Sequence, residues 1–211
     1  MQLGKKTPKQ EQTASKPAKG KKRTRKTRIT IGVAAAVGAA MIASGAWGLI
    51  GKFSEKHQPG TIEGIRTWSD LGRNHTTESV EYPMRPPAGG DHNPVWLKCE
   101  GTLYTKEVRE ENAVHSLEHG AVWVTYNDKA SAADVGALKK LVASTNYTLM
   151  SPYEGQKSPI TLTAWGHQLG VDHADDPRVG RFFREYVQGM QTPEPYASCE
   201  GGYMRQAPTK S

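Results

Sequence analysis

The pattern of hydrophobic and polar positions in the second half of the chain predicts three strands. Residues 121–126 (AVWVTY) form a β-branched and aromatic run of strand length. Residues 147–150 and 160–165 carry similar runs, and the sequence between them is rich in Pro, Gly and Ser, which is typical of a turn-rich connection. We therefore expect a small sheet in this part of the chain.

Three helices are expected around these strands. Residues 106–119 become helical towards their end, and Gly120 follows at the position where glycine commonly ends a helix. A second helix is expected over 131–143, because its first residue is a serine that can cap it and its apolar residues share one face. A third is expected from about 176 to 188, with Pro177 in its first turn.

The order helix, strand, helix, strand, strand, helix favours an α+β fold with a small sheet covered by helices. Residues 81–98 contain many Pro and Gly and are expected to form a structured loop, whereas 52–80 reads as a linker followed by a short strand or turn. We place one compact domain at residues 81–200 and expect a disordered tail at 201–211.

An uncharged segment precedes this domain. Residues 29–51 hold no charged side chain over 23 positions, and an α-helix needs about 20 apolar residues to cross a bilayer. Residues 1–28 hold eleven Lys and Arg and one Glu, a net charge of +10, so the rest of the +7 chain is net −3. By the positive-inside rule we expect 1–28 to be a disordered cytoplasmic tail, and the chain from residue 52 onward to be extracytoplasmic. A cleaved signal peptide is the alternative.

This separation of charge decides which partners are expected. Because the excess of positive charge belongs to the tail, it gives no reason to expect nucleic-acid binding. Basic residues beside a membrane segment contact anionic lipid, so the expected partner is the bilayer of the plasma membrane. The small residues of 29–51 also permit close packing against a protein of a membrane complex.

The chain has two cysteines, Cys99 and Cys199, both on the side expected to be extracytoplasmic. We predict a disulfide between them, because oxidising compartments preserve such bonds. Closing a loop of about 100 residues would stabilise the fold by about 4–5 kcal/mol in the chain-entropy model. A thiolate metal ligand or two free thiols are the alternatives, and the lack of a C-x-x-C pair gives little support to thiol exchange.

Three histidines are the main candidates for chemistry. His115 and His119 are four residues apart on a predicted helix, so they project from one face at a spacing that can chelate one metal ion. His92, in the sequence GGDHNP, is the expected third ligand. Asp91 and Glu118 are expected to orient the imidazoles by accepting hydrogen bonds.

Met150 closes a predicted strand and would add a soft thioether ligand. Histidine and methionine together suggest copper, whereas three histidines with an open position also suit zinc. The alternative is that His115 and His119 are ordinary polar residues at a helix C-terminus, where a protonated imidazole interacts well with the helix dipole. His167 follows a strand and is a weaker candidate to line a pocket. The remaining histidines lie in polar segments and are expected to be solvated: His57, His75 and His173.

The sequence HSLEH at 115–119 also fits the H-x-x-E-H pattern of inverted zinc peptidases, in which the Glu is the general base towards zinc-bound water. That pattern needs a third ligand, commonly a Glu on a downstream helix, whereas here Gly120 and a predicted strand follow at once. A zinc hydrolase with Glu118 as base is therefore a less favoured alternative.

The runs PPAGGDHNPVW, VHSLEHGAVWVTY, SPYEG and TAWGHQL, in this order, resemble the domain-of-unknown-function family 3105 over about residues 80–200. The resemblance implies a prokaryotic, often actinobacterial, protein with one N-terminal membrane helix. It also implies that the histidine cluster belongs to the recurring motif, with His167 at a less constant position. The motif residues are Pro86, Pro87, Gly89, Gly90, His92, His115, Glu118, His119 and Gly120.

Two hypotheses follow besides the hydrolase. The first is a membrane-anchored extracytoplasmic protein that binds a metal, copper rather than zinc, and serves metal handling or the assembly of a membrane complex. Its ligands would be His92, His115 and His119, with Met150 as a fourth. The second is a non-catalytic accessory subunit of an envelope complex, in which the histidine cluster is a structural hydrogen-bonded group.

Overall fold

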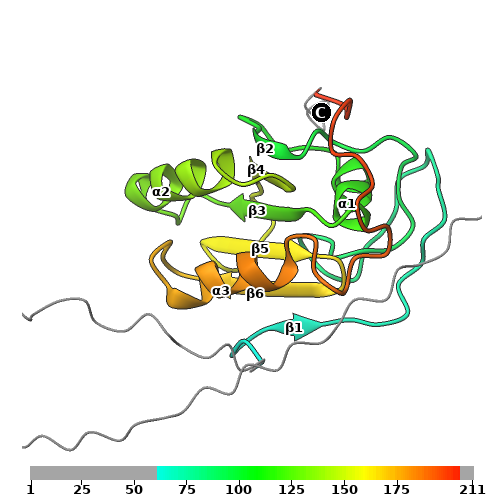
Figure 1. Ribbon diagram of the computed structural model, residues 1–211. Helices are drawn as coiled ribbons and strands as arrows, with labels where there is room; N and C mark the ends of the chain where they lie inside the picture. The colour runs from blue at the N-terminus through cyan, green and yellow to red at the C-terminus, as the bar shows by residue number, and fades with distance from the viewer. Residues whose placement is uncertain (1–60, 205–211) are drawn as a thin grey trace, which may run out of the picture. The chain divides into compact units, whose positions relative to one another are not determined.

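The protein forms one mixed sheet with helices on both of its faces (Figure 1). The computed structural model describes residues 61–204, and for this part of the chain the expected α+β class is confirmed. The elements follow in the order β1 (Arg66–Thr67), β2 (Glu100–Leu103), α1 (Glu110–Glu118), β3 (Val122–Tyr126), α2 (Ala132–Ala143), β4 (Thr148–Pro152), β5 (Ile160–Ala164), β6 (His167–Val171) and α3 (Pro177–Tyr186).

The strands of the described region lie in the order β1-β6-β5-β3-β4-β2. β3 and β4 run parallel, and α2 is the crossover between them. β2 adds parallel to β4 at one edge, whereas β5, β6 and β1 add antiparallel on the other side of β3. The central position of β3 accounts for its sequence VWVTY, because a strand with neighbours on both sides and both faces covered is mostly apolar.

Alternation along β3 divides the hydrophobic core into two clusters, since successive side chains of a strand point to opposite faces. Val122 and Val124 belong to the cluster that α2 and α3 cover. Trp123 belongs to a second cluster, which includes Leu117 of α1. In Figure 1, α1 lies at one end of the sheet, beside the loop that precedes β2 and the C-terminal segment. This second side of the sheet carries the candidate site.

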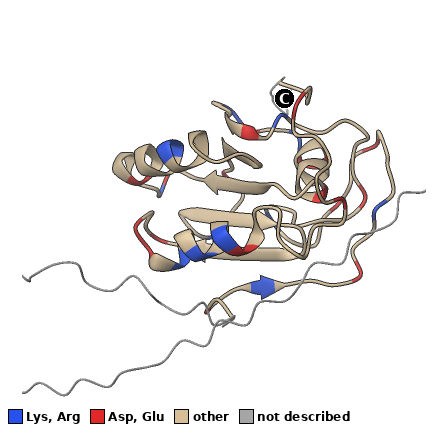
Figure 2. Ribbon diagram, viewed as in Figure 1, with Lys and Arg blue, Asp and Glu red and all other residues tan. Residues whose placement is uncertain are grey.

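The three predicted helices are present, and α3 shows the physical basis of the pattern most clearly. Val179, Phe182 and Phe183 are buried against the sheet, while basic positions lie along the same helix in Figure 2. Asp176 caps the helix by accepting a hydrogen bond from the Arg178 N–H at 2.8 Å. The amphipathic pattern and this cap together set the position of α3.

The sequence pattern did not predict β2 and β6. β6 is interrupted by polar and small residues, and it forms because it pairs with β5 through a tight turn at Gly166, whose φ is +68°. Its Gln168 is fully buried because the side-chain amide donates to the carbonyl of Pro86 at 2.9 Å. In β2, Gly101 has a φ of +67° and the register with β4 shifts beside it. Both segments are strands because they pair with neighbouring strands. Neither has a local periodicity that would mark it as a strand.

Several predictions concern residues outside the described range. The basic tail 1–28, the membrane helix 29–51 and the first part of the linker lie there, so they stay predictions. Among residues 61–204 no helix has the length and apolar character needed to cross a membrane. Residues 201–204 belong to the folded domain, because the Tyr203 N–H donates to the carbonyl of Trp96 at 2.8 Å.

Candidate metal centre

The last turn of α1 presents three of the candidate residues. Glu110 and Glu111 in the first turn favour the helix through its dipole, and the helix ends because Gly120 follows with a φ of +89°. His115 and His119 are one turn apart and buried, and their Nε2 atoms lie 3.0 Å from each other. The predicted helix thus brings the two imidazoles into contact, with their rings nearly perpendicular.

Four side chains converge next to this pair. One ligand atom from each of His75, His92, His115 and Glu118 lies within 4.8 Å of the others. The His92 and His115 ring centroids are 4.9 Å apart, and the His75 ring stacks on His115 at 5.0 Å. His75 is exposed, whereas the other three are buried. We call these four residues the inner group; His119 contacts the group through His115 but is not part of it.

Backbone carbonyls fix the orientation of three imidazoles. The Nδ1 atom of His92 lies 2.8 Å from the backbone carbonyl oxygen of Gly90. The Nδ1 atom of His115 lies 2.6 Å from the carbonyl oxygen of Asn93, and the Nδ1 atom of His119 lies 2.8 Å from that of Ser198. Because a carbonyl only accepts, each Nδ1 carries the proton and donates it, which leaves Nε2 as the free lone pair of the neutral ring. This arrangement is the one that orients metal-ligating histidines in proteins.

Glu118 is the negative charge of the inner group. Its Oε2 lies 2.9 Å from His92 Nε2, and its Oε1 accepts a hydrogen bond from Arg73 Nε at 2.8 Å. Burial would raise the pKa of Glu118, but His92 and Arg73 outweigh it and lower that pKa to about 2. Burial would lower the pKa of His92, but the Glu118 carboxylate and the Gly90 carbonyl outweigh it and raise that pKa above its ordinary value. The two side chains therefore form a buried ion pair.

His115 and His119 behave differently from His92. Burial lowers the pKa of His115, and with the neighbouring histidines it outweighs the opposing effect of the Asn93 carbonyl, which leaves that pKa at about 4. Burial also lowers the pKa of His119. Both rings are thus neutral near pH 7, with two acceptor nitrogens 3.0 Å apart.

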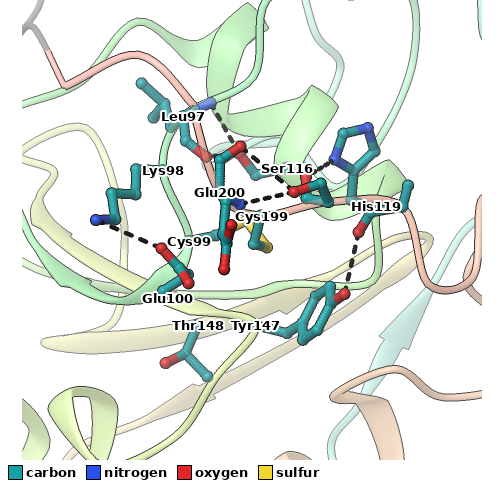
Figure 3. The surroundings of a disulfide bond; sticks show 12 residues. Leu97, Lys98, Cys99, Glu100, Ser116, His119, Tyr147, Thr148, Cys199 and Glu200 are labelled. Atoms are coloured by element: carbon teal, nitrogen blue, oxygen red, sulfur yellow. Dashed lines mark hydrogen bonds and ion pairs between the residues drawn. A yellow bond between two sulfur atoms is a disulfide. The ribbon is translucent and has the colours of Figure 1, made fainter.

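Residues 187–204, which we call the C-terminal strap, hold His119 in place. Figure 3 shows His119 beside the strap, and the His119 Nδ1–H donates to the Ser198 carbonyl at 2.8 Å. The predicted disulfide between Cys99 and Cys199 is present and both residues are buried. The Tyr147 hydroxyl also donates to the strap, at the Ala197 carbonyl (3.1 Å). The disulfide thus fixes the carbonyl that orients one of the site's imidazoles.

Residues 74–201 match the family described as Protein of unknown function (DUF3105). The chain belongs to this family. Neither a curated protein nor a solved structure matches it significantly.

The matched region of this DUF3105 member contains the whole candidate site. Gly89 and Gly90 have φ values of +139° and +125°, which disfavour any residue with a side chain. A Cβ at Gly89 would also press against Leu71 and Trp165. The two glycines therefore let the loop turn so that the Gly90 carbonyl meets the His92 ring, and the glycines of the motif serve to orient the histidine.

The structure does not bring every predicted residue to the DUF3105 site. Met150 lies in the hydrophobic cluster on the other face of the sheet, because along β4 it is Leu149 that points towards α1. Asp91 accepts from the Asn74 backbone N–H at 2.9 Å and so shapes the loop, without contacting an imidazole nitrogen directly. His167 donates to the Trp165 carbonyl and packs on Tyr186.

Three further residues of the DUF3105 site had no signal in the sequence pattern. His75 is exposed, as expected of a solvated histidine, but its ring also stacks on His115 and its backbone pairs with that of His92. Glu194 reaches the site from the C-terminal strap, with Oε2 3.8 Å from His119 Nε2. Trp96 packs on His119, with ring centroids 5.0 Å apart. All three lie in irregular segments, where neither helical nor strand periodicity marks an inward position.

We predict that Gly120→Ala destabilises the domain by about 1–3 kcal/mol. The residue has a positive φ, and a Cβ there would collide with the side chains of Gln188 and Thr192 on the strap. Urea denaturation measures the effect. Gly136→Ala is the matched control, because that glycine lies inside α2 with no atom within 4 Å of a new Cβ, and alanine there should stabilise the helix by about 0.5–1 kcal/mol. Equal effects of the two changes would contradict the proposed role of Gly120.

Proposed function

We propose that this protein is a membrane-anchored, extracytoplasmic metal-binding protein, with the inner group as its ligand set. The observation that carries the proposal is the orientation of the imidazoles. His92 and His115 each donate Nδ1–H to a backbone carbonyl and turn Nε2 towards the same buried space. Such a fixed tautomer leaves both rings ready to ligate. The anchor rests on the uncharged segment 29–51.

The size of the inner group is compatible with one ion. Two ligands at about 2.0–2.1 Å from a metal lie roughly 2.9–4.2 Å apart, for ligand–metal–ligand angles from about 90° to 180°. The widest separation here is 4.8 Å, so a modest inward movement closes the group. His75 is exposed and can make that movement. The His92 Nε2 atom is buried with Glu118 Oε2 at 2.9 Å, so an ion bound between these two ligand atoms would replace the proton that they share.

The donor atoms favour a divalent transition metal. Three imidazoles and one carboxylate suit Cu²⁺ and Zn²⁺, and for a given site of this kind Cu²⁺ binds more tightly. Met150 lies on the other face of the sheet and both cysteines are in the disulfide, so no thioether or thiolate joins the described site. We therefore propose Cu²⁺ over Zn²⁺, used in metal handling or in the assembly of a membrane complex.

A structural role is the second candidate. The ion pair between His92 and Glu118 is complete without a metal, and Arg73 supplies a further positive charge. Such a group could tie the loop at 92 to α1 in an accessory subunit. A hydrolase is less favoured, because a carboxylate paired on both oxygens, with a pKa of about 2, is a weak general base.

The test is a titration of the purified full chain, stripped with a chelator, with Cu²⁺ and with Zn²⁺. We expect about one ion per chain, retained through gel filtration and measured by elemental analysis. The double change His92→Gln and His115→Gln removes two ligands and should weaken binding by more than about 100-fold.

His173→Gln is the matched control, since it removes an exposed imidazole paired only with Asp134. Met150→Leu should also leave binding unchanged. Circular dichroism establishes that each variant is folded. If the folded wild-type chain retains neither ion, the structural role is correct and the metal-binding proposal fails.

A further inference from the structure

The pair His115 and His119 is unusual as a buried contact. Each Nδ1 is committed to a backbone carbonyl, so in the neutral rings both Nε2 atoms are acceptors. They nevertheless lie 3.0 Å apart in the interior. Two acceptor nitrogens at this distance repel unless a positive charge lies between them. The separation is close to that of two nitrogens bound to one metal ion at about 2.0–2.1 Å.

A carboxylate and a cationic side chain lie on the outer side of this pair. Glu194 Oε2 is 3.8 Å from His119 Nε2, and the Glu194 backbone N–H donates to the Glu118 carbonyl at 3.0 Å, which holds it beside α1. The Glu194 side chain is 47% exposed. Arg73 contacts both carboxylates: its Nη2 lies 3.7 Å from Glu194 Oε1, and its Nε lies 2.8 Å from Glu118 Oε1. The exposed Arg73 guanidinium thus occupies the space between the two carboxylates, where a cation would be favoured.

We propose that His115, His119 and Glu194 form a second, transient position for a divalent cation, through which the ion enters the inner group. This inference rests on the proposed metal-binding function. His115 belongs to both positions, but its Nδ1 is occupied, so only Nε2 can ligate and it serves one ion at a time. The ion therefore passes from His119 to His92 and Glu118 without leaving His115, while Arg73 moves towards solvent.

This arrangement predicts a specific kinetic signature. A group that acts only on the entry path changes the barrier for binding and for release alike, so both rate constants change by the same factor and Kd stays constant. A resident ligand behaves differently, because its loss weakens Kd mainly through faster dissociation. The distinction can be followed by tryptophan fluorescence, since Trp96 lies 5.0 Å from His119 and Trp165 lies 6.0 Å from His92.

The experiment is stopped-flow mixing of the full chain with Cu²⁺ alone, followed by displacement with a chelator to measure release. Glu194→Gln should slow association and release equally, by about 10-fold, because it removes the attracting charge at the entrance. His119→Gln should act in the same direction. Arg73→Gln should speed both steps, because it removes the competing cation. Glu200→Gln is the matched control, since it deletes the same charge from the same strap, and its rates should equal those of the wild type.

Three results would overturn the proposal. Unchanged rates in Glu194→Gln would show that the carboxylate takes no part. A weaker Kd with unchanged association would make Glu194 a resident ligand. Equal slowing of both steps by His75→Gln, with no effect of Glu194→Gln, would place the entrance at the exposed histidine of the inner group. A wild-type chain that binds no Cu²⁺ at all is a separate outcome, which rejects the proposed function together with this inference.

Discussion

Replacing both cysteines, Cys99→Ala with Cys199→Ala, is expected to lower the free energy of unfolding by about 4–5 kcal/mol. The disulfide closes a loop across a sequence separation of 100 residues, and in the chain-entropy model a loop of that size restricts the unfolded state strongly. The same change should slow Cu²⁺ association and release alike, because the strap then loses the bond next to Ser198, whose carbonyl orients His119. Guanidinium denaturation and stopped-flow mixing with Cu²⁺ measure the two effects.

Reduction of the wild-type chain provides an independent version of this test. Cys199 lines a surface pocket together with Tyr147 and Tyr196, so a small thiol reductant can approach the bond from that side. The reductant should reproduce the stability loss of the double variant and leave the double variant itself unchanged. A fully reduced chain that keeps wild-type Cu²⁺ association and release rates would show that the strap does not depend on the bond.

Glu118→Gln is expected to destabilise the metal-free domain at neutral pH and to matter little in strong acid. The folded-state pKa of Glu118 is lowered from 4.5 to about 2, so its ionised form stabilises the fold above pH 4.5, and this contribution is lost as the pH falls towards 2. A shift of this size corresponds to about 3 kcal/mol. Denaturation of both proteins at pH 7 and pH 2, in the presence of a chelator, measures the difference.

The two proteins should differ at pH 7 by about 3 kcal/mol and converge near pH 2. The control is Glu78→Gln, which removes an exposed carboxylate outside the inner group and should cost less than about 0.5 kcal/mol at either pH. A constant difference between wild type and Glu118→Gln across the whole range would show that the carboxylate acts through packing or hydrogen bonding, and not through its charge.

The elements that the sequence predicted are those whose side chains follow a period. β3 is β-branched and aromatic throughout, α3 has an apolar face with a proline in its first turn, and both were placed within about two residues. β6 was missed because Gln168 and Gly170 break the pattern, and its strand conformation depends on pairing with β5. Local propensity carries no information about such a partner.

The residues of the site differ in the same way, because those on a periodic element were easier to place than those in irregular segments. The spacing of His115 and His119 on a helix was sufficient to predict that they share a face. His92 was placed with them by its glycine-rich loop and by the family motif. Met150 was misplaced, because a shift of one residue along a strand moves a side chain to the opposite face of the sheet. Glu194 follows Glu118 by 76 positions and reaches it through an irregular segment, so only the fold could bring the two together.

The position of the disulfide also sets an order of events for the maturing chain. The C-terminal strap positions His119 and supplies Glu194, and its covalent link to the rest of the domain forms only when two thiols are oxidised. Under the proposed function, the chain with reduced cysteines would therefore load Cu²⁺ more slowly than the oxidised chain, so the redox state of Cys99 and Cys199 would set when the site fills.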